Sequence, residues 1–292
     1  MMVREPAVAG RFYPRDRRTC LDEIRKMFVP QDFPDVPDHP VGGVVPHAGW
    51  LFSGDTAFMV LRAIESRRRP DTFVMFGASH RPYTGNALFP EGVWRTPLGE
   101  VSVNARLADA ILSRAGAADL LTADARAHAA EHSLEVQLPF LQYLFPDVQI
   151  VPILVCGNGD PVTLGKVAGE VIRDRQADAV CIGSSDLTHY GSSYGFTPQG
   201  LGEAAVRWVR DENDRRMLHL METLDAEHVV PEARNHMNAC GAGAIAATVA
   251  SARALGATAG HVVQYTTSFD VMRDRMGQTD YEAAVGYPGV VF

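Results

Sequence analysis

The sequence of 292 residues predicts an α/β fold with a largely parallel sheet and helices on both of its faces. Three observations support this prediction. Short apolar runs alternate with longer helical patterns, glycine or proline bounds each run, and no repeat or low-complexity linker interrupts the order. Buried parallel strands have such continuous apolar runs because both of their faces are covered. Strands that alternate with helices typically form parallel sheets.

Four apolar runs are the predicted central strands, and a turn follows each of them. They comprise residues 41–45, 72–76, 149–155 and 179–182. Helical patterns are expected at about 54–66, 104–115, 133–145, 163–176 and 242–255. The chain is long enough for one large α/β domain or two small ones.

Composition excludes several classes of protein. The hydrophobic fraction of 46% and the charged fraction of 21% are ordinary for a globular protein, and the net charge of −8 disfavours a nucleic-acid surface. No apolar stretch reaches the roughly 18 residues that a membrane-spanning helix needs, and no signal-peptide core follows Arg4 and Glu5. We therefore expect a cytoplasmic protein without membrane contact. Its four cysteines are far apart in sequence and form no CxxC pair, which favours free thiols.

Two histidines follow predicted strands and are candidate metal ligands. His47 comes after the run 41–45 and His80 after the run 72–76. Ligands of open α/β sheets bind beyond the carboxyl ends of the strands, so the two imidazoles should converge there. Each histidine taken alone could instead cap its loop through hydrogen bonds.

Cys240 is the third candidate ligand. It precedes the alanine-rich helix predicted at about 242–255, where exposed N–H groups and the helix dipole favour a thiolate. With His47 and His80 it would supply two imidazoles and one sulfur, a set suited to copper, zinc or ferrous iron. Three protein ligands leave one coordination position open, as in catalytic metal sites.

Asp186 and His189 follow the predicted strand 179–182 and are candidate catalytic residues. A carboxylate near an imidazole orients the ring and raises its basicity, which prepares a general base. The alternative is that Asp186 caps the next helix and His189 is an ordinary polar neighbour. His132 precedes a helix expected to begin near Ser133 and could face the same cleft.

One motif competes with this interpretation. The segment from His128 to His132 matches the H-x-x-E-H pattern of a class of zinc metalloproteases. That pattern needs both histidines on one face of a continuous helix and a distant glutamate ligand, and no downstream segment supplies one. The sequence disfavours the protease, and it also lacks a P-loop, a GxGxxG turn after a strand and a GxSxG elbow.

Several motifs together resemble the Memo family, whose prokaryotic members are known as AmmeMemoRadiSam system protein B. They span nearly the whole chain in order: residues 4–10, 12–14, 45–49, 77–80, 131–139, 184–186, 239–241 and 281–287. Ala78 is a local departure, because the family usually has proline at this position.

The resemblance implies one three-layer α/β/α domain over residues 1–292, with a largely parallel or mixed sheet shared with the LigB-like class III extradiol dioxygenases. It implies that His47, His80 and Cys240 bind the metal, that His189 corresponds to the acid/base histidine of the dioxygenases, and that His132 lines the cleft. The dioxygenases have a carboxylate as third ligand to non-haem iron. Cys240 in its place argues against the same reaction.

These observations lead to one expected function and two alternatives. We expect a metal-dependent redox enzyme related to the dioxygenases, with copper or iron, or else zinc, as its metal. The first alternative is a non-catalytic module that binds a peptide or partner protein in the same cleft. The second is a hydrolytic zinc enzyme. The resemblance also implies a functional association with a radical SAM protein, and the substrate would be a small molecule or a peptide.

Overall fold

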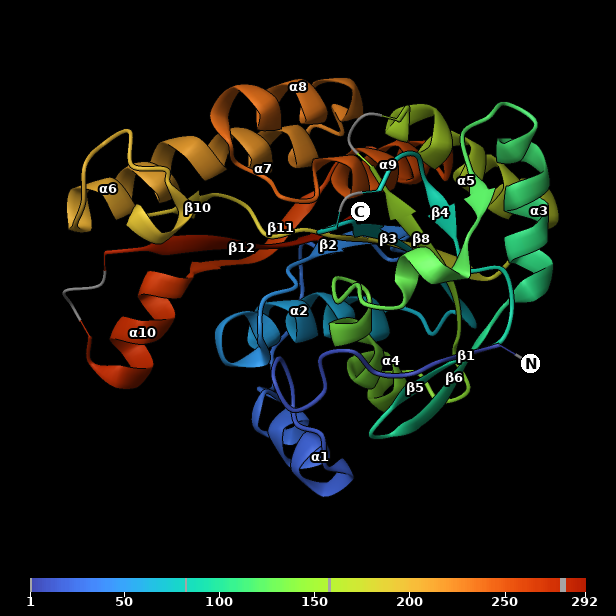
Figure 1. Cartoon of the computed structure of the whole chain (residues 1–292), viewed down its shortest axis with the longest axis horizontal. Helices are drawn as coiled ribbons and strands as arrows, with labels where there is room; N and C mark the ends of the chain where they lie inside the picture. Colours follow the sequence, from blue (N-terminus) through green and yellow to red (C-terminus); the bar gives the residue numbers. More distant parts are fainter. Residues whose placement is uncertain (1, 82, 157–158, 279–281) are drawn as a thin grey trace.

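The computed structural model describes residues 2–81, 83–156, 159–278 and 282–292. Its strands form one mixed sheet that lies between two layers of helices (Figure 1). The predicted α/β fold with three layers is therefore confirmed. Tyr281, the first residue of the motif at 281–287, lies outside the described residues. One domain over residues 1–292 stays a prediction.

Five parallel strands form the centre of the sheet. In spatial order they are β6 (Gly99–Val103), β8 (Gln149–Val155), β3 (Thr72–Ala78), β9 (Ala179–Ser184) and β2 (Gly42–Val45). Four of them are the strands predicted from the apolar runs, and nearly all of the residues in those four are buried. Because β3, β9 and β2 are neighbours, their carboxyl ends lie side by side at one edge of the sheet.

Antiparallel strands extend the sheet and make it mixed. Beyond β2 lies β12 (Ala284–Val291), which pairs antiparallel with β2 and also with β11 (His261–Thr267) and β10 (His189–Tyr190). The remaining strands are β5 (Val93–Thr96), β1 (Val3–Arg4), β4 (Ala87–Leu88) and β7 (Thr122–Ala123). β5 pairs antiparallel with β6, so a short turn can join them, whereas the parallel strands need crossover helices.

Helices cover both faces of the sheet (Figure 1). On one face α9 (Ala242–Ala254) lies on β9 and β3 and packs against α5 (Pro161–Arg175). The other helices of this layer are α3 (Ala105–Gly116), α6 (Glu203–Trp208), α7 (Asp214–Glu222) and α8 (Ala226–His236). The opposite layer contains α2 (Trp50–Glu65), α4 (Leu138–Leu144), α1 (Arg17–Lys26) and α10 (Ser268–Met276). Among the described helices, none has the length and apolar character to cross a membrane.

Small residues let α5 and α9 approach closely. A Cβ atom placed on Gly165 would lie 2.0 Å from the carbonyl oxygen of Ala247, and one on Gly169 would lie 2.7 Å from that of Ser251. Real Cβ atoms do not come so near, so both positions require glycine. The alanine-rich segment is therefore a tightly packed helix, as its sequence predicts.

The helix predicted over 133–145 is shorter in the structure. A 3₁₀ turn (Glu135–Gln137) precedes α4, and Pro139 stands in the first turn of that helix. Proline has no N–H and disfavours helical geometry in the residue before it, so it suits the start of a helix and not its interior. Two further 3₁₀ turns comprise Ala125–His128 and Ser192–Tyr194.

A buried ion pair fixes the amino-terminal segment against this 3₁₀ turn. Arg4 pairs with Glu135, whose carboxylate also accepts hydrogen bonds from the backbone N–H groups of Ala7 and Val8 at 2.8 and 2.9 Å. The hydroxyl of Tyr13 donates to the same carboxylate at 2.9 Å. These contacts hold residues 4–13 in place and bring the neighbouring Phe12 to the cleft described next.

Candidate metal centre

A cavity of about 350 Å³ lies at the edge of the sheet where β2, β3 and β9 end. It brings together five of the six residues singled out in the sequence: His47, His80, His132, Asp186 and His189. The rest of its lining is largely aromatic or small: Phe12, Ala48, Gly49, Phe52, Tyr194, Ser268, Val285 and Tyr287. The prediction that these distant polar groups converge is confirmed.

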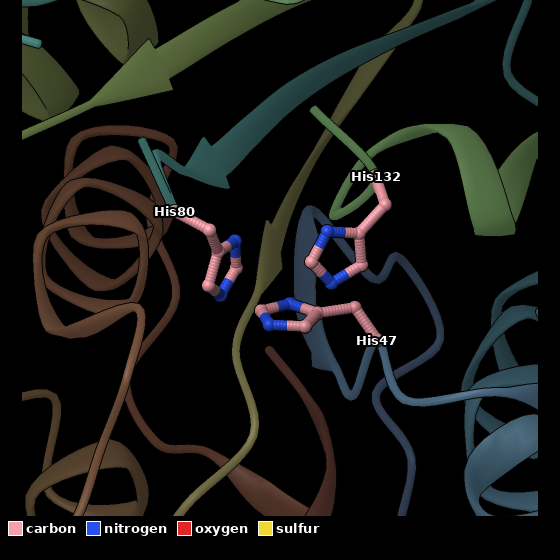
Figure 2. A group of neighbouring side chains, drawn as sticks. All are labelled: His47, His80 and His132. Carbon is pink, nitrogen blue, oxygen red and sulfur yellow. The ribbon is translucent and has the colours of Figure 1, made fainter. Parts of the chain in front are cut away.

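Three histidines face one another in this cavity (Figure 2). His47, His80 and His132 each offer a ring nitrogen, and these nitrogens all lie within 4.8 Å of one another. The ring centroids are separated by 4.5 Å to 5.3 Å. Neutral imidazole nitrogen is a common ligand of transition metals. The cluster could therefore hold a metal ion.

The hydrogen bonds of His47 leave one ring nitrogen unprotonated. Its Nδ1 lies 2.9 Å from Oγ of Ser184, and that hydroxyl donates its own hydrogen to the carbonyl of Ser133 at 2.7 Å. Nδ1 must therefore carry the hydrogen of the ring, and Nε2 keeps its lone pair. Burial lowers the pKa of His47 well below its ordinary value, so the ring is neutral at pH 7.

Glu131 positions the other two histidines. Its carboxylate accepts from the backbone N–H of His80 at 2.8 Å and from Nδ1 of the same ring at 3.0 Å. It also accepts from the backbone N–H groups of His132 and Ser133 at 2.7 and 2.9 Å. Burial alone would raise the pKa of Glu131, but the contacts with His80 outweigh it and lower the pKa far below the usual range. A carboxylate that holds Nδ1–H of His80 leaves Nε2 of this ring available for an ion.

His132 is a member of the cluster and is packed at the side of the cleft. The centroids of its ring and of the Phe12 ring lie 4.7 Å apart, and 19% of the His132 side chain is exposed. Burial, followed by the charge of His80, lowers the pKa of His132 to about 4. The ring is therefore uncharged at neutral pH and can act as a ligand or as a contact to substrate.

Cys240 approaches the cluster at His47. Its Sγ lies 3.2 Å from the unprotonated Nε2 of that ring and 3.5 Å from the carbonyl oxygen of Asp186. Cys240 is not among the three residues whose ligand atoms all lie within 4.8 Å of one another in the described part of the chain. The structure thus brings the predicted sulfur to one ring of the group.

The protonation expected for Cys240 differs from the one found. Cys240 has exposed surface, yet burial of the thiol, followed by the charge of Asp186, raises its pKa to about 12. Cys240 precedes the N-cap Gly241 of α9, whose N–H donates to Oγ of Ser185 at 2.9 Å and is not directed at the thiol. In the metal-free chain the residue is a thiol, and a bound cation would be needed to deprotonate it.

Asp186 and His189 both line the cavity, but their nearest partners are backbone groups. A carboxylate oxygen of Asp186 accepts from the N–H of His47 at 2.7 Å, which fixes the turn after β2. Nδ1 of His189 donates to the carbonyl of Leu187 at 3.1 Å, so Nε2 is the nitrogen of this ring that can act in the cleft. Burial raises the pKa of Asp186, and the nearby His189 opposes this rise. The catalytic roles of both residues stay predictions.

The metalloprotease arrangement is absent from the described residues 128–132. His128 ends a short 3₁₀ turn and no continuous helix connects it to His132. The ring of His128 is fully buried between Phe89 and Trp94, with Nε2 3.1 Å from the carbonyl of Ala87. The H-x-x-E-H match is therefore a coincidence of spacing.

Sequence reasoning missed two residues of the site. Ser184 and Glu131 orient the rings of His47 and His80, and neither was predicted to do so. A signal existed for both, since Glu131 adjoins His132 and Ser184 follows the predicted strand 179–182. Their partners could not be read from the sequence because each hydrogen bond joins distant segments.

Fold and site together define a class of protein: an α/β sheet with a histidine-lined candidate metal cleft at the carboxyl ends of its parallel strands. The chain belongs to the Memo-like protein family, whose model matches residues 4–291. It is 38% identical to a MEMO1 family protein of Thermococcus onnurineus, over 100% of this chain and 99% of that protein. It is 37% identical to one of Pyrococcus horikoshii, over 99% of both chains. The crystal structure of an uncharacterized protein from Escherichia coli K12 aligns with this chain at a TM-score of 0.52 and 11% sequence identity. The alignment covers 85% of this chain and 98% of that protein, and it shows a shared fold alone.

Proposed function

We propose that this protein is a metal-dependent redox enzyme whose ion is held by His47, His80 and Cys240. The observation that carries the proposal is the contact of 3.2 Å between Sγ of Cys240 and Nε2 of His47, which is one of the three clustered histidines. A sulfur and an imidazole nitrogen on one tetrahedral ion lie roughly 3.5 Å apart, given metal bonds of about 2.3 and 2.0 Å. The donor pair therefore fits a shared ion.

The protonation of the rings also fits. Nε2 of His47 is free of hydrogen, because Ser184 accepts the hydrogen on Nδ1 of this neutral ring, and Glu131 holds Nδ1 of His80, which leaves Nε2 as the nitrogen of His80 that can bind an ion. Such outer partners raise the basicity of a ligand and fix its orientation. Glu131 is buried and ionised, so it also supplies negative charge beside the cluster.

A metal bound there would supply redox chemistry and an open position for substrate or oxygen. The residues around it have separate tasks. His189 accepts or donates a proton at Nε2, since Nδ1 is held by Leu187. His132 contacts the substrate from the opposite wall, and the aromatic side chains Phe12 and Phe52 exclude water from the reacting groups.

Copper or iron is the proposed metal. A thiolate with two imidazoles favours a soft or borderline ion over magnesium or calcium, and both copper and iron support one-electron chemistry. Zinc would bind the same donors without redox activity. Metal identity therefore separates the redox proposal from a hydrolytic one.

Elemental analysis after anaerobic purification tests the ligand set, since air can oxidise the thiol. We expect stoichiometric copper or iron in the natural protein and at least a tenfold loss of affinity in Cys240→Ser. Cys156→Ser is the matched control, because Cys156 is a buried thiol whose Sγ contacts the carbonyl of Tyr83 and not the histidines. His132→Gln should keep the metal and lose turnover, measured as oxygen uptake with catechol-type substrates.

The variants distinguish the two sets of ligands. Normal metal content in Cys240→Ser together with loss in His132→Gln would overturn the sulfur ligand and leave three histidines. Absence of metal from the natural protein, with no uptake from added copper, iron or zinc, would overturn the proposal as a whole.

A second candidate is a binding module without turnover, and the aromatic lining of the cleft favours it. Phe12, Phe52, Tyr194 and Tyr287 give the walls the composition of a surface that recognises a peptide or another ligand with apolar groups. A metal-free protein that captures such a ligand, and loses it on Phe52→Ala, would support the module. Association with a radical SAM protein stays a prediction under either candidate.

A further inference from the structure

A wide helical turn contacts the segment that carries His189, and Asn213 is its last residue. Residues Val209–Asn213 form a π turn between α6 and α7, closed by a bond from the N–H of Asp214 to the carbonyl of Val209. Such turns are rare and frequently occur at functional sites. Asn213 is fully buried here.

The side chain of Asn213 reaches the segment that carries His189. Its Nδ2 donates to Oγ1 of Thr188 at 2.9 Å, and Thr188 is the residue directly before His189. Asp214 contacts the same threonine, since its carboxylate accepts from the N–H of Thr188 at 3.0 Å and from its hydroxyl. Consecutive side chains of a regular α-helix point about 100° apart. The wide turn lets both of them converge on one residue.

Asn213 also holds the segment that carries Cys240. The same Nδ2 donates to the carbonyl of His236 at 3.0 Å, at the end of α8. The backbone carbonyl oxygen of Asn213 accepts from Nδ2 of Asn238 at 2.8 Å, and Asn238 is buried two residues before Cys240. One residue is thereby bonded to both ends of the short connection between α8 and the cysteine.

We propose that Asn213 is a positioning residue, whose amide and carbonyl set the place of the Cys240 turn relative to the strand of His189. The two segments are far apart in sequence and meet at the cleft from different elements. The contacts of Asn213 with Thr188 and Asn238 are buried and the one with His236 is partly buried, so each is worth more than an exposed one. The expected effect on metal affinity rests on the proposed function, whereas the positioning of the Cys240 turn does not depend on a metal.

The test uses Asn213→Leu and measures the rate at which a thiol reagent modifies each cysteine of the metal-free protein. Leucine keeps the size of asparagine and removes the side-chain donor Nδ2, whereas the backbone carbonyl that accepts from Asn238 remains. Asn86→Leu is the matched control, because Asn86 is also buried and accepts from the N–H of Cys156 at 2.9 Å, away from the cleft. Peptide mass analysis after labelling reports Cys240 and Cys156 separately.

We expect a crossed result. Asn213→Leu should speed the labelling of Cys240 by about tenfold, since the turn opens more often when two hydrogen bonds are lost, and should leave Cys156 within about twofold. Asn86→Leu should speed the labelling of Cys156 by about tenfold and leave that of Cys240 within about twofold. Equal labelling of Cys240 in both variants would overturn the proposal, because it would show only general loosening.

A milder variant keeps the test decisive if Asn213→Leu does not fold. Thr188→Val removes the acceptor at the His189 end and should still speed the labelling of Cys240, though less. In the double variant the two effects should add less than fully, because both variants remove the contact between Asn213 and Thr188. Additive effects, or no effect of Thr188→Val, would contradict the bridge.

Metal affinity separates this inference from the proposed function. If the protein binds metal as proposed, Asn213→Leu should lower the affinity for added Co²⁺ by about tenfold and weaken the sulfur-to-cobalt absorption band, with Asn86→Leu unchanged. If the natural protein binds none of copper, iron, zinc and Co²⁺ while the crossed labelling is observed, the proposed function fails and the positioning role stands.

Discussion

Glu131 is the residue on which the geometry of two histidines depends. Glutamine has nearly the same shape as glutamate, but it is uncharged and has an NH₂ donor in place of one of the two accepting oxygens. We expect Glu131→Gln to lower metal affinity by about 10- to 100-fold, as changes to the outer partners of metal ligands do. Titration with a metal chelator measures the effect. Glu100→Gln, on an exposed strand position, should leave affinity unchanged; a similar loss in this control would point to net charge as the cause.

Asp214 makes the stability of the protein depend on pH. Burial, opposed by hydrogen bonds from Thr188 and Tyr265, raises the pKa of Asp214 from 3.8 to about 6. The folded protein therefore holds this proton more tightly than the unfolded chain, so the stabilising contribution is complete below pH 4 and is lost as the pH rises to about 6. A change of this size corresponds to roughly 3 kcal/mol.

Asp214→Asn removes this dependence. Relative to the natural protein, the variant should gain on the order of 3 kcal/mol in free energy of unfolding between pH 4 and pH 7.5, measured by urea denaturation at each pH. Asp211→Asn, at an exposed position of the same helical segment, should show a constant difference. A constant difference in Asp214→Asn as well would refute the pKa assigned here.

The sequence predicts which residues at the ends of strands line the cavity, but it does not predict their hydrogen-bond partners. His47, His80, Asp186 and His189 were predicted to converge because each follows a buried strand, and the cavity contains all of them. The place of His132 within the histidine cluster was not predicted, since it comes from a loop whose course is set by Glu131 and by the backbone of residues 131–133. Long-range hydrogen bonds of this kind leave no periodic trace in a sequence.

Helix packing is the feature to test at the level of elements. Gly165→Ala places a Cβ atom against the backbone of α9, so one helix must move. We expect the free energy of unfolding to fall by about 1–3 kcal/mol, because overpacking outweighs the higher helix propensity of alanine. In Gly116→Ala, at the end of α3, the nearest atom lies at 3.4 Å, and stability should be unchanged or higher. Equal stability of the two variants in denaturant would contradict the close approach.

Elements were predicted best where the apolar pattern was long. The strand at 149–155 is found with the predicted bounds, and the helix at 242–255 ends one residue early. The π turn and the 3₁₀ turn before α4 were not predicted. They depend on how Asn213 and Glu135 bond to distant segments, and local propensity carries no information about such bonds.

At the scale of the whole molecule, a bound metal should stabilise the fold. The proposed ligands come from segments that meet only in the native sheet, so an ion that binds them favours the folded state. At a free metal concentration of about 100 times the dissociation constant, the gain is about 2.7 kcal/mol. Thermal unfolding with and without added metal measures it. A variant with His80→Ala and Cys240→Ser should show no shift, and a shift of normal size there would place the ion elsewhere.

The position of β12 has a consequence for biosynthesis. This strand follows β2, β3 and β9 in sequence, yet it pairs directly with β2, and its residues Val285 and Tyr287 form part of the cavity. A nascent chain that has already made the histidine-bearing strands still lacks one wall of the cleft until residues 284–291 leave the ribosome. The cavity is therefore complete only after β12 has been synthesised and has paired with β2.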